Sequence, residues 1–274
     1  MDNSEEVYHV VSLSGGKDST AMLLLMLKKE MKIDVVLNAD TGMEFPEMYE
    51  HLKKLDDLLY QERGIHITTL KHPKGFEWLM FEEPKVRKSA IVRRLQNNIP
   101  LEGNGWPRFG VRWCTGQLKT MLINEKAKEL SEKQKIVQYI GIAYDERKRC
   151  KEKKYPLVEW GITEADALEI CYNQGFYFGG LYEIYKRASC WCCLFQRIGE
   201  LRNLRKYHPE LWERLRKMDE RAIEQFGRTP LGKFRKTWTI GQLEERFKKE
   251  EQLIVHTEIL EERREGNTED SLQN

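Results

Sequence analysis

Short apolar runs alternate with longer helix-forming segments along the first half of the chain. Apolar runs short enough for single strands occupy residues 7–13, 33–37, 65–70 and 136–142. Between them, residues 19–30, 46–62 and 118–130 are rich in strong helix formers, and the second of these segments begins at Pro46. This alternation predicts an α/β fold, in which a parallel sheet carries helices on both faces.

The second half of the chain is mainly helical in pattern. Thr163 followed by Asp166 predicts an N-cap and an acidic first turn for a helix through Gln174. Residues 200–226 predict a long charged helix interrupted near Pro209, and residues 243–262 predict a final helix. We therefore expect a first domain over residues 1–150, a helical, cysteine-bearing region packed on it over 151–265, and a disordered tail over 266–274.

Residues 74–116 interrupt this pattern, because prolines and glycines are mixed there with aromatic and basic side chains. An irregular stretch of this length inside a domain is typical of an active-site loop or lid.

Composition narrows the class of protein. Charged residues make up 33% of the 274 positions, and the formal net charge is +2. No apolar run approaches the ~20 residues that span a bilayer, and the N-terminus lacks a signal-peptide pattern, so we expect a cytoplasmic protein without a membrane partner. In that compartment the six cysteines are expected to be thiols, metal ligands or catalysts rather than disulfides.

A glycine-containing string, SLSGGKDS at residues 12–19, links the first predicted strand to the first predicted helix. Gly15 and Gly16 allow the backbone to approach a phosphate closely, and the free amides of the helix start favour an anion. Lys17 adds a cation, and Asp18 can hold Mg²⁺ against the phosphates. The serines of the string, Ser12, Ser14 and Ser19, are candidate phosphate ligands. The string does not fit the Walker pattern G-x-x-x-x-G-K-[ST].

The string resembles the PP-loop signature of ATP pyrophosphatases, which cleave ATP between the α and β phosphates. Three further motifs follow it along the chain: NADTGMEFPE, RWCTGQLK and GIAYDE. Together they resemble the phosphoadenosine phosphosulfate (PAPS) reductase branch of the PP-loop superfamily, and residues 155–193 are similar to PAPS reductase-like proteins of bacteria and phages. Asp40 and Thr41 end the second strand, where α/β sheets bind ligands. The resemblance implies an adenine nucleotide across the strand ends, with Asp40 and Gly141 near its base or ribose.

The cysteines form a candidate metal site. Cys190, Cys192 and Cys193 lie within four residues, and Cys114 is a candidate fourth ligand. Four thiolates suit a [4Fe–4S] cluster or zinc, although C-x-C-C matches no standard zinc-finger spacing. Resemblance to cluster-binding reductases and sulfurtransferases favours the cluster, but those reductases carry a Cys-Cys pair where this chain has Cys114 followed by Thr115. Packed thiols without metal are the remaining alternative.

Within the family resemblance, we expect an enzyme that uses ATP and Mg²⁺ to adenylate an acceptor, so that sulfur can displace AMP. Lys17, Asp18 and Arg147 would act on the phosphates, and Cys114 or one of the three clustered cysteines would handle sulfur. A sulfonucleotide reductase is an alternative. It is disfavoured because such enzymes use a cysteine in a C-terminal tail and commonly lose SGGKDS, whereas no cysteine follows Cys193 here. A non-catalytic nucleotide- or cluster-binding subunit is a second alternative.

The acceptor is suggested by basic and aromatic residues. Residues 85–94 are basic, and Trp106, Arg108, Arg112 and Trp113 follow them. Cations interleaved with aromatics suit a single nucleic-acid strand, although such patches are also common in proteins that bind none. The resemblance to tRNA-thiolating and DNA-phosphorothioating enzymes implies a tRNA or DNA acceptor and a sulfur donor such as a cysteine desulfurase. The oligomeric state stays open.

Overall fold

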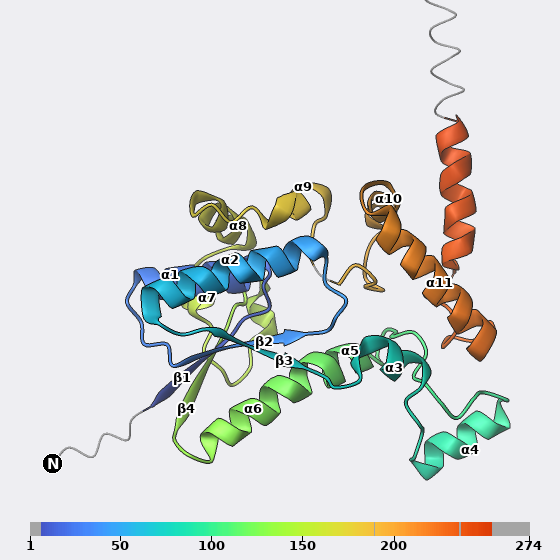
Figure 1. Ribbon diagram of the computed structural model, residues 1–274, viewed down its shortest axis with the longest axis horizontal. Coiled ribbons are helices and arrows are strands. Elements are labelled where there is room, and N and C mark those ends of the chain that lie inside the picture. The colour runs from blue at the N-terminus through green and yellow to red at the C-terminus, as the bar shows by residue number, and fades with distance from the viewer. Residues whose placement is uncertain (1–6, 189, 236, 254–274) are drawn as a thin grey trace, which may run out of the picture. The chain divides into compact units, whose positions relative to one another are not determined.

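A parallel sheet forms the centre of the fold in the computed structural model, which describes residues 7–188, 190–235 and 237–253 (Figure 1). Within these residues the sheet has four strands, β1 (Tyr8–Ser12), β2 (Val35–Asp40), β3 (Ile67–Lys71) and β4 (Ile136–Ile140), in the order β3-β2-β1-β4. Every neighbouring pair is parallel. The predicted α/β class is confirmed.

Helices cover both faces of the sheet. Helices α1 (Lys17–Lys28) and α2 (Pro46–Arg63) lie on one face, and α6 (Met121–Ser131) contacts β2, β3 and β4 on the other (Figure 1). This follows from right-handed crossovers, because the chain moves outward from β1 to β3 and then returns past β1 to β4. The core of α1 includes Met22, Leu23 and Met26, which have no exposed surface.

Several shorter elements complete the chain. They are α3 (Gly75–Phe81), α4 (Lys88–Gln96), α5 (Trp113–Thr115), the π-helix η1 (Gly116–Thr120), the 3₁₀ turns η2 (Tyr144–Arg149) and η3 (Phe178–Gly180), α7 (Pro156–Glu159), α8 (Glu164–Asn173), α9 (Leu181–Ile184), α10 (Ile198–Tyr207) and α11 (Pro209–Phe226). Residues 240–253 are also helical. The predicted break near Pro209 is confirmed.

The stretch 74–116 differs from its prediction as an irregular lid. It contains α3, whose Phe76, Leu79, Met80 and Phe81 are buried, and the basic helix α4. Trp106 and Trp113 are buried too, and the Trp113 indole N–H donates to the carbonyl of Gly105 at 3.1 Å. Apolar side chains therefore anchor much of this stretch in the core, and the two tryptophans are not available to stack on bases.

The chain divides into two compact units, and the predicted domains over residues 1–150 and 151–265 stay a prediction. One unit comprises residues 1–84 and 102–200, and the other comprises 85–101 and 201–274. Residues 151–200 belong to the first unit because α8 packs along α1. The predicted tail over 266–274 and the end of the last predicted helix lie outside the described residues. Among the described helices, none has the length and apolar character that a bilayer crossing needs.

The second unit has its own buried polar anchor. The Asp219 side chain, 1% exposed on α11, accepts backbone N–H groups of Phe234 at 3.0 Å and Ile240 at 2.7 Å. The Ile240 bond lies at the start of the helical residues 240–253, so a distant carboxylate caps that helix.

Candidate functional site

The site lies where the strand order reverses, between β1 and β4. Loops that follow neighbouring strands on opposite sides of such a point form the crevice in which α/β sheets bind ligands. The PP-loop (residues 12–19) follows β1, and the segment Gly141–Glu146 follows β4. A Cβ on Gly141 would lie 2.6 Å from the Ser19 Cα and 2.9 Å from the Asp18 carbonyl oxygen, so only glycine permits the two loops to approach this closely. The structure therefore gives Gly141 a packing role. Its predicted contact with the nucleotide stays a prediction.

The serines of the PP-loop form hydrogen bonds within the loop and to the sheet. Gly15 adopts a φ of 80°, and Gly16 precedes the first residue of α1 without a side-chain cap on the helix amides. The Ser19 hydroxyl lies 3.0 Å from the Ser14 hydroxyl and donates to the Gly16 carbonyl oxygen at 3.0 Å. Ser12 differs, because its hydroxyl accepts a hydrogen bond from the Gln138 side chain of β4 at 2.8 Å. Ser14 and Ser19 thus shape the loop, while Ser12 joins it to the sheet.

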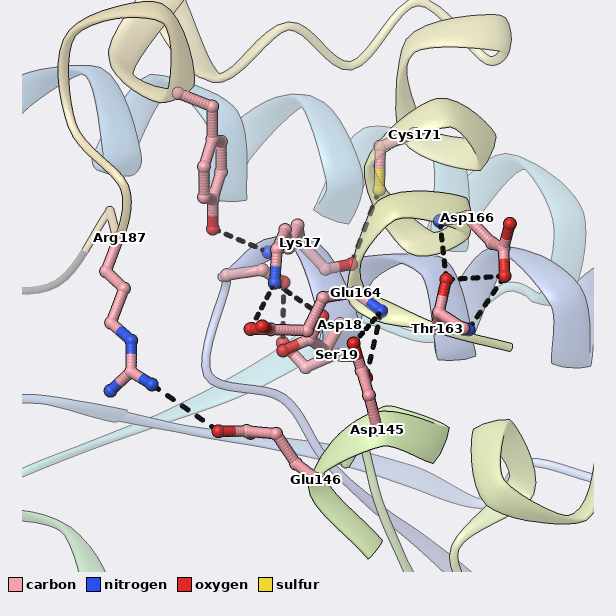
Figure 2. Close-up of polar contacts among 12 residues, drawn as sticks. Lys17, Asp18, Ser19, Asp145, Glu146, Thr163, Glu164, Asp166, Cys171 and Arg187 are labelled. Atoms are coloured by element: carbon pink, nitrogen blue, oxygen red, sulfur yellow. Dashed lines mark hydrogen bonds and ion pairs between the residues drawn. The ribbon is translucent and has the colours of Figure 1, made fainter. Parts of the chain in front are cut away.

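Lys17 meets several carboxylates at the start of α1 (Figure 2). Its ammonium lies 2.9 Å from Asp18 Oδ1 and 2.8 Å from Glu164 Oε1. Burial lowers the pKa of Lys17, but the two carboxylates outweigh it and the net shift is upward. Burial raises the pKa of Asp18 despite Lys17, whereas the hydrogen bond from Lys17 lowers that of Glu164.

Glu146, from the loop after β4, completes an acidic cluster. Oxygens of Asp18, Glu146 and Glu164 all lie within 4.8 Å of one another, an arrangement that can hold a divalent cation. Glu146 also pairs with Arg149 and, at 3.4 Å, with Arg187, which points toward it in Figure 2. Lys17 therefore pairs with two of the three carboxylates, and the third, Glu146, pairs with Arg149 and Arg187.

Sequence reasoning missed three contributors to this centre: Glu146, Glu164 and Tyr182. Glu164 opens α8, where an acidic residue is fully explained by the helix dipole. The Thr163–Asp166 capping box predicted from sequence is present, and the Asp145 side chain accepts the Glu164 N–H at 3.1 Å (Figure 2). These caps fix the start of α8 beside the PP-loop.

Arg147 takes a different position from the one expected of a phosphate ligand. Its guanidinium lies over the Tyr144 ring, 4.5 Å from the ring centre, and donates to the Tyr144 carbonyl oxygen at 3.1 Å. The side chain is exposed. Its predicted catalytic role stays a prediction.

A cavity of about 370 Å³ adjoins the PP-loop at Ser14 and continues along the ends of β2 and β3 to Glu44. This volume is within the range of about 300–1,000 Å³ typical of small-molecule sites. Asp40 lines it and accepts hydrogen bonds from the Gly42 amide at 2.7 Å and the Tyr49 hydroxyl at 2.9 Å. Burial would raise the Asp40 pKa, but these donors and the Lys71 ammonium at 2.8 Å lower it below the usual value. Asp40 is thus an ionised, fixed acceptor.

The four predicted metal-ligand cysteines lie close enough to one another for their charges to interact. Burial raises the pKa of Cys114, Cys190 and Cys192, and each is raised further by at least one of the other cysteines of the set, including Cys193. The cluster is therefore a real convergence of α5 with residues 190–193. Without a metal the buried thiols stay protonated.

Glu44 connects the cavity to the cysteines. It lines the cavity, accepts the Cys190 thiol at 3.4 Å, and pairs with the Lys119 ammonium at 3.0 Å. Burial lowers the Lys119 pKa, but Cys190 and Glu44 reverse the shift and raise it. Thr41 belongs to the same cluster, since its hydroxyl lies 3.5 Å from the Cys190 sulfur. The predicted contact of Thr41 with the nucleotide stays a prediction.

The sulfur spacing bears on which metal the cysteines fit. A single zinc ion binds thiolates at about 2.3 Å, which places sulfurs roughly 3.8 Å apart in a tetrahedron. Across the described residues, no three cysteine sulfurs lie within 4.8 Å of one another. In a multi-iron cluster each cysteine binds a different iron, so the sulfurs stand further apart.

Comparison with known proteins assigns the family. A profile of the phosphoadenosine phosphosulfate reductase domain matches residues 8–155, more than half of the chain. The chain belongs to the PAPS reductase family. The match spans the PP-loop and the β4 loop, and it ends before Glu164, Tyr182 and the clustered cysteines 190, 192 and 193. The family resemblance predicted from the motifs is confirmed.

Two individual proteins resemble this PAPS reductase family member. Uncharacterized protein MJ0066 of Methanocaldococcus jannaschii is 27% identical over 219 residues, which cover 75% of this chain and 40% of that protein. The chain thus spans less than half the length of this curated relative. A solved structure, U34-tRNA thiolase NcsA from Methanococcus maripaludis with its [4Fe–4S] cluster, overlaps 81% of this chain and 74% of that chain, with 16% identity and a TM-score of 0.37. This identity and this TM-score are too low to support any conclusion about this chain.

Proposed function

We propose that this protein is an ATP pyrophosphatase that adenylates an acceptor and so prepares it for sulfur transfer. The observation that carries the proposal is the acidic cluster of Asp18, Glu146 and Glu164 around Lys17. Mg²⁺-ATP brings a cation that these three carboxylates can bind. A sulfonucleotide that enters without a metal gains nothing from them.

The charge of the cavity supports the same nucleotide. Its lining carries Lys53 and Lys71 against Asp40, Glu44 and Asp56. Lys71 is already paired with Asp40 at 2.8 Å. PAPS carries a 3′-phosphate that needs a cation in the site, and the Lys71 of this lining is already neutralised by Asp40. A ribose with free hydroxyls can instead donate to Asp40.

In the proposed reaction, the acceptor oxygen attacks the α-phosphorus, the bond to the bridging oxygen breaks, and pyrophosphate leaves. Lys17 and the amides at the start of α1 would stabilise the charge on that pyrophosphate. Asp18, Glu146 and Glu164 would hold the Mg²⁺ that it leaves with. Arg147 would add a second cation that binds the leaving pyrophosphate. Sulfide then displaces AMP from the adenylated acceptor.

Calorimetry of the protein against Mg²⁺-ATP and against PAPS tests the nucleotide. We expect ATP to bind more tightly than PAPS, and chelation of Mg²⁺ with EDTA to remove the ATP preference. The structure predicts no metal dependence for a PAPS site, so PAPS binding that is tighter and indifferent to EDTA would contradict the proposal. It would favour sulfonucleotide reduction, the alternative that the family name suggests. Tight ATP binding with no release of pyrophosphate in the presence of candidate acceptors would instead favour a binding subunit.

We propose that Cys114, Cys190, Cys192 and Cys193 hold an iron–sulfur cluster, which would carry or pass the sulfide. Anaerobically purified protein is expected to contain about four irons per chain, following the [4Fe–4S] stoichiometry, and little zinc. Cys192→Ser is expected to lower the iron content severalfold, because Cys192 is buried among the other three. Cys150→Ser is the matched control, since Cys150 directly follows the basic turn η2 and is not one of the four proposed ligands. Zinc at one ion per chain, or equal loss in both variants, would refute the cluster.

A nucleic-acid strand is the acceptor that we propose, with RNA as the first candidate and a cysteine desulfurase as a suitable sulfur donor. Arg87, Lys88 and Arg93 of the basic segment are exposed, whereas Trp106 and Trp113 are buried and contribute no stacking. Repeating the calorimetry with single-stranded RNA and DNA at 50 and 200 mM salt tests the acceptor. Neutralising several phosphates requires affinity to fall steeply with salt, and affinity independent of salt would exclude this acceptor.

A further inference from the structure

A tyrosine hydroxyl accepts a hydrogen bond from a backbone N–H group at the PP-loop. The Lys17 backbone N–H donates to the Tyr182 hydroxyl oxygen at 2.8 Å. Lys17 is the first residue of α1, and its amide is among the helix N–H groups that lack an intrahelical partner and bind anions. A Cβ on Gly16 would lie 3.4 Å from the same hydroxyl, so the tip of the ring stands over the bare backbone of the loop. A phosphate oxygen and this hydroxyl compete for one donor.

The Lys17 side chain is also hydrogen-bonded to this part of the chain. Its ammonium donates to Glu164 Oε1 at 2.8 Å (Figure 2). Glu164 begins α8 and Tyr182 lies in α9, and between them the Cys171 thiol donates to the Lys17 carbonyl oxygen at 3.4 Å (Figure 2). Residues 163–185, which we call the strap, therefore contact the amide, the carbonyl and the ammonium of Lys17. The strap lies beyond residue 155, where the family match ends.

We propose that the strap is an autoinhibitory element, in which the Tyr182 hydroxyl acts as an internal ligand of the PP-loop that the nucleotide phosphate must displace. The proposal rests on the proposed function only in requiring a phosphate-bearing ligand at this loop. It holds for ATP or PAPS alike. The Tyr182 hydroxyl oxygen and a phosphate oxygen would compete for the Lys17 backbone N–H.

The chemistry of the two competitors makes the displacement feasible. Burial raises the pKa of Tyr182, so its hydroxyl is neutral at physiological pH. Hydrogen bonds from an amide to a charged phosphate are roughly twice as strong as those to a neutral oxygen, so a phosphate wins the Lys17 amide. The Tyr182 ring lies edge-on against Phe178, at 4.8 Å between ring centres.

Calorimetry on Tyr182→Phe with magnesium pyrophosphate, Mg²⁺-ATP and PAPS tests the competition. The change removes the hydroxyl and keeps the ring. We expect about threefold to tenfold tighter binding of the preferred ligand, since a net hydrogen bond of this kind contributes ~0.5–1.5 kcal/mol. Tyr172→Phe is the control, because Tyr172 lies on α8 and packs against Tyr177 instead of the loop. Unchanged or weaker binding by Tyr182→Phe would overturn the proposal and identify the hydroxyl as a spectator or a phosphate ligand.

Hydrogen exchange of the unmodified protein gives a second test that needs no variant. Magnesium pyrophosphate is expected to speed amide exchange in residues 181–188, because the strap is released. Slower or unchanged exchange there contradicts autoinhibition. The two proposals fail separately: tighter PAPS binding by Tyr182→Phe supports the strap while refuting the ATP preference. Weaker binding by that variant, in a protein that still prefers Mg²⁺-ATP, refutes the strap alone.

Discussion

Replacing Lys17 by alanine is expected to lower the rate of ATP cleavage by about 100- to 1,000-fold, the usual effect of removing one preorganised donor to a developing negative charge. The ammonium is within 3 Å of Asp18 and Glu164, so its loss also leaves the acidic cluster without its central cation. The phosphates of ATP would then meet carboxylates that Mg²⁺ alone must neutralise. Release of pyrophosphate and AMP measures the effect.

Lys28→Ala is the matched control for this experiment. Lys28 lies in the last turn of the same helix, and its side chain is exposed. The same charge is removed from the same element, but far along α1 from the loop. ATP cleavage that survives in Lys17→Ala, or that falls equally in both variants, would remove Lys17 from the site.

Gly141→Ala is expected to destabilise the protein and to weaken nucleotide binding together. The added Cβ would lie 2.6 Å from the Ser19 Cα and 2.8 Å from its nitrogen, and backbone atoms cannot move aside as a flexible side chain can. Overpacking of this kind costs about 1–3 kcal/mol. For a chain of this size, each kcal/mol lowers the melting temperature by about 2–4 °C. Thermal unfolding and calorimetry with the preferred nucleotide measure the two effects.

Gly199→Ala provides the comparison for Gly141→Ala. Gly199 lies in helix α10, and no heavy atom is within 4 Å of the position of its added Cβ. Alanine is the better helix former, so this variant is expected to be at least as stable as the original protein. A melting temperature unchanged in Gly141→Ala would mean that the loops after β1 and β4 do not meet as closely as described.

The sequence by itself determined the features whose cause is local. Each strand is a short apolar run, each crossover helix follows from its helix formers, and the break between α10 and α11 lies at Pro209. The SLSGGKDS string was recognisable because its glycines, lysine and helix start act within eight residues. The capping box at Thr163 and Asp166 was likewise predictable, since its partners are three residues apart.

The common site of the cysteines was only partly predictable from the sequence. Their residue types favoured a common site, but Cys114 is separated from Cys190 by a strand, several turns and α8. The resemblance implied the site, and the fold brings the four thiols together. Glu44 and Lys119 lie in the motifs NADTGMEFPE and RWCTGQLK, but the sequence did not show that their side chains pair beside Cys190.

Only the tertiary structure decided which side chains reach Lys17. Glu164 and Tyr182 are 147 and 165 residues away from it along the chain, and in the sequence they are a helix-start acid and an ordinary aromatic residue. For Trp106 and Trp113 the sequence suggested an exposed binding surface, because both lie in a basic stretch. The structure shows that both side chains are buried. Periodicity and spacing report what a residue does within its own element. Packing between α8 and α1, which no local pattern encodes, determines whether the phosphate loop is open or already occupied.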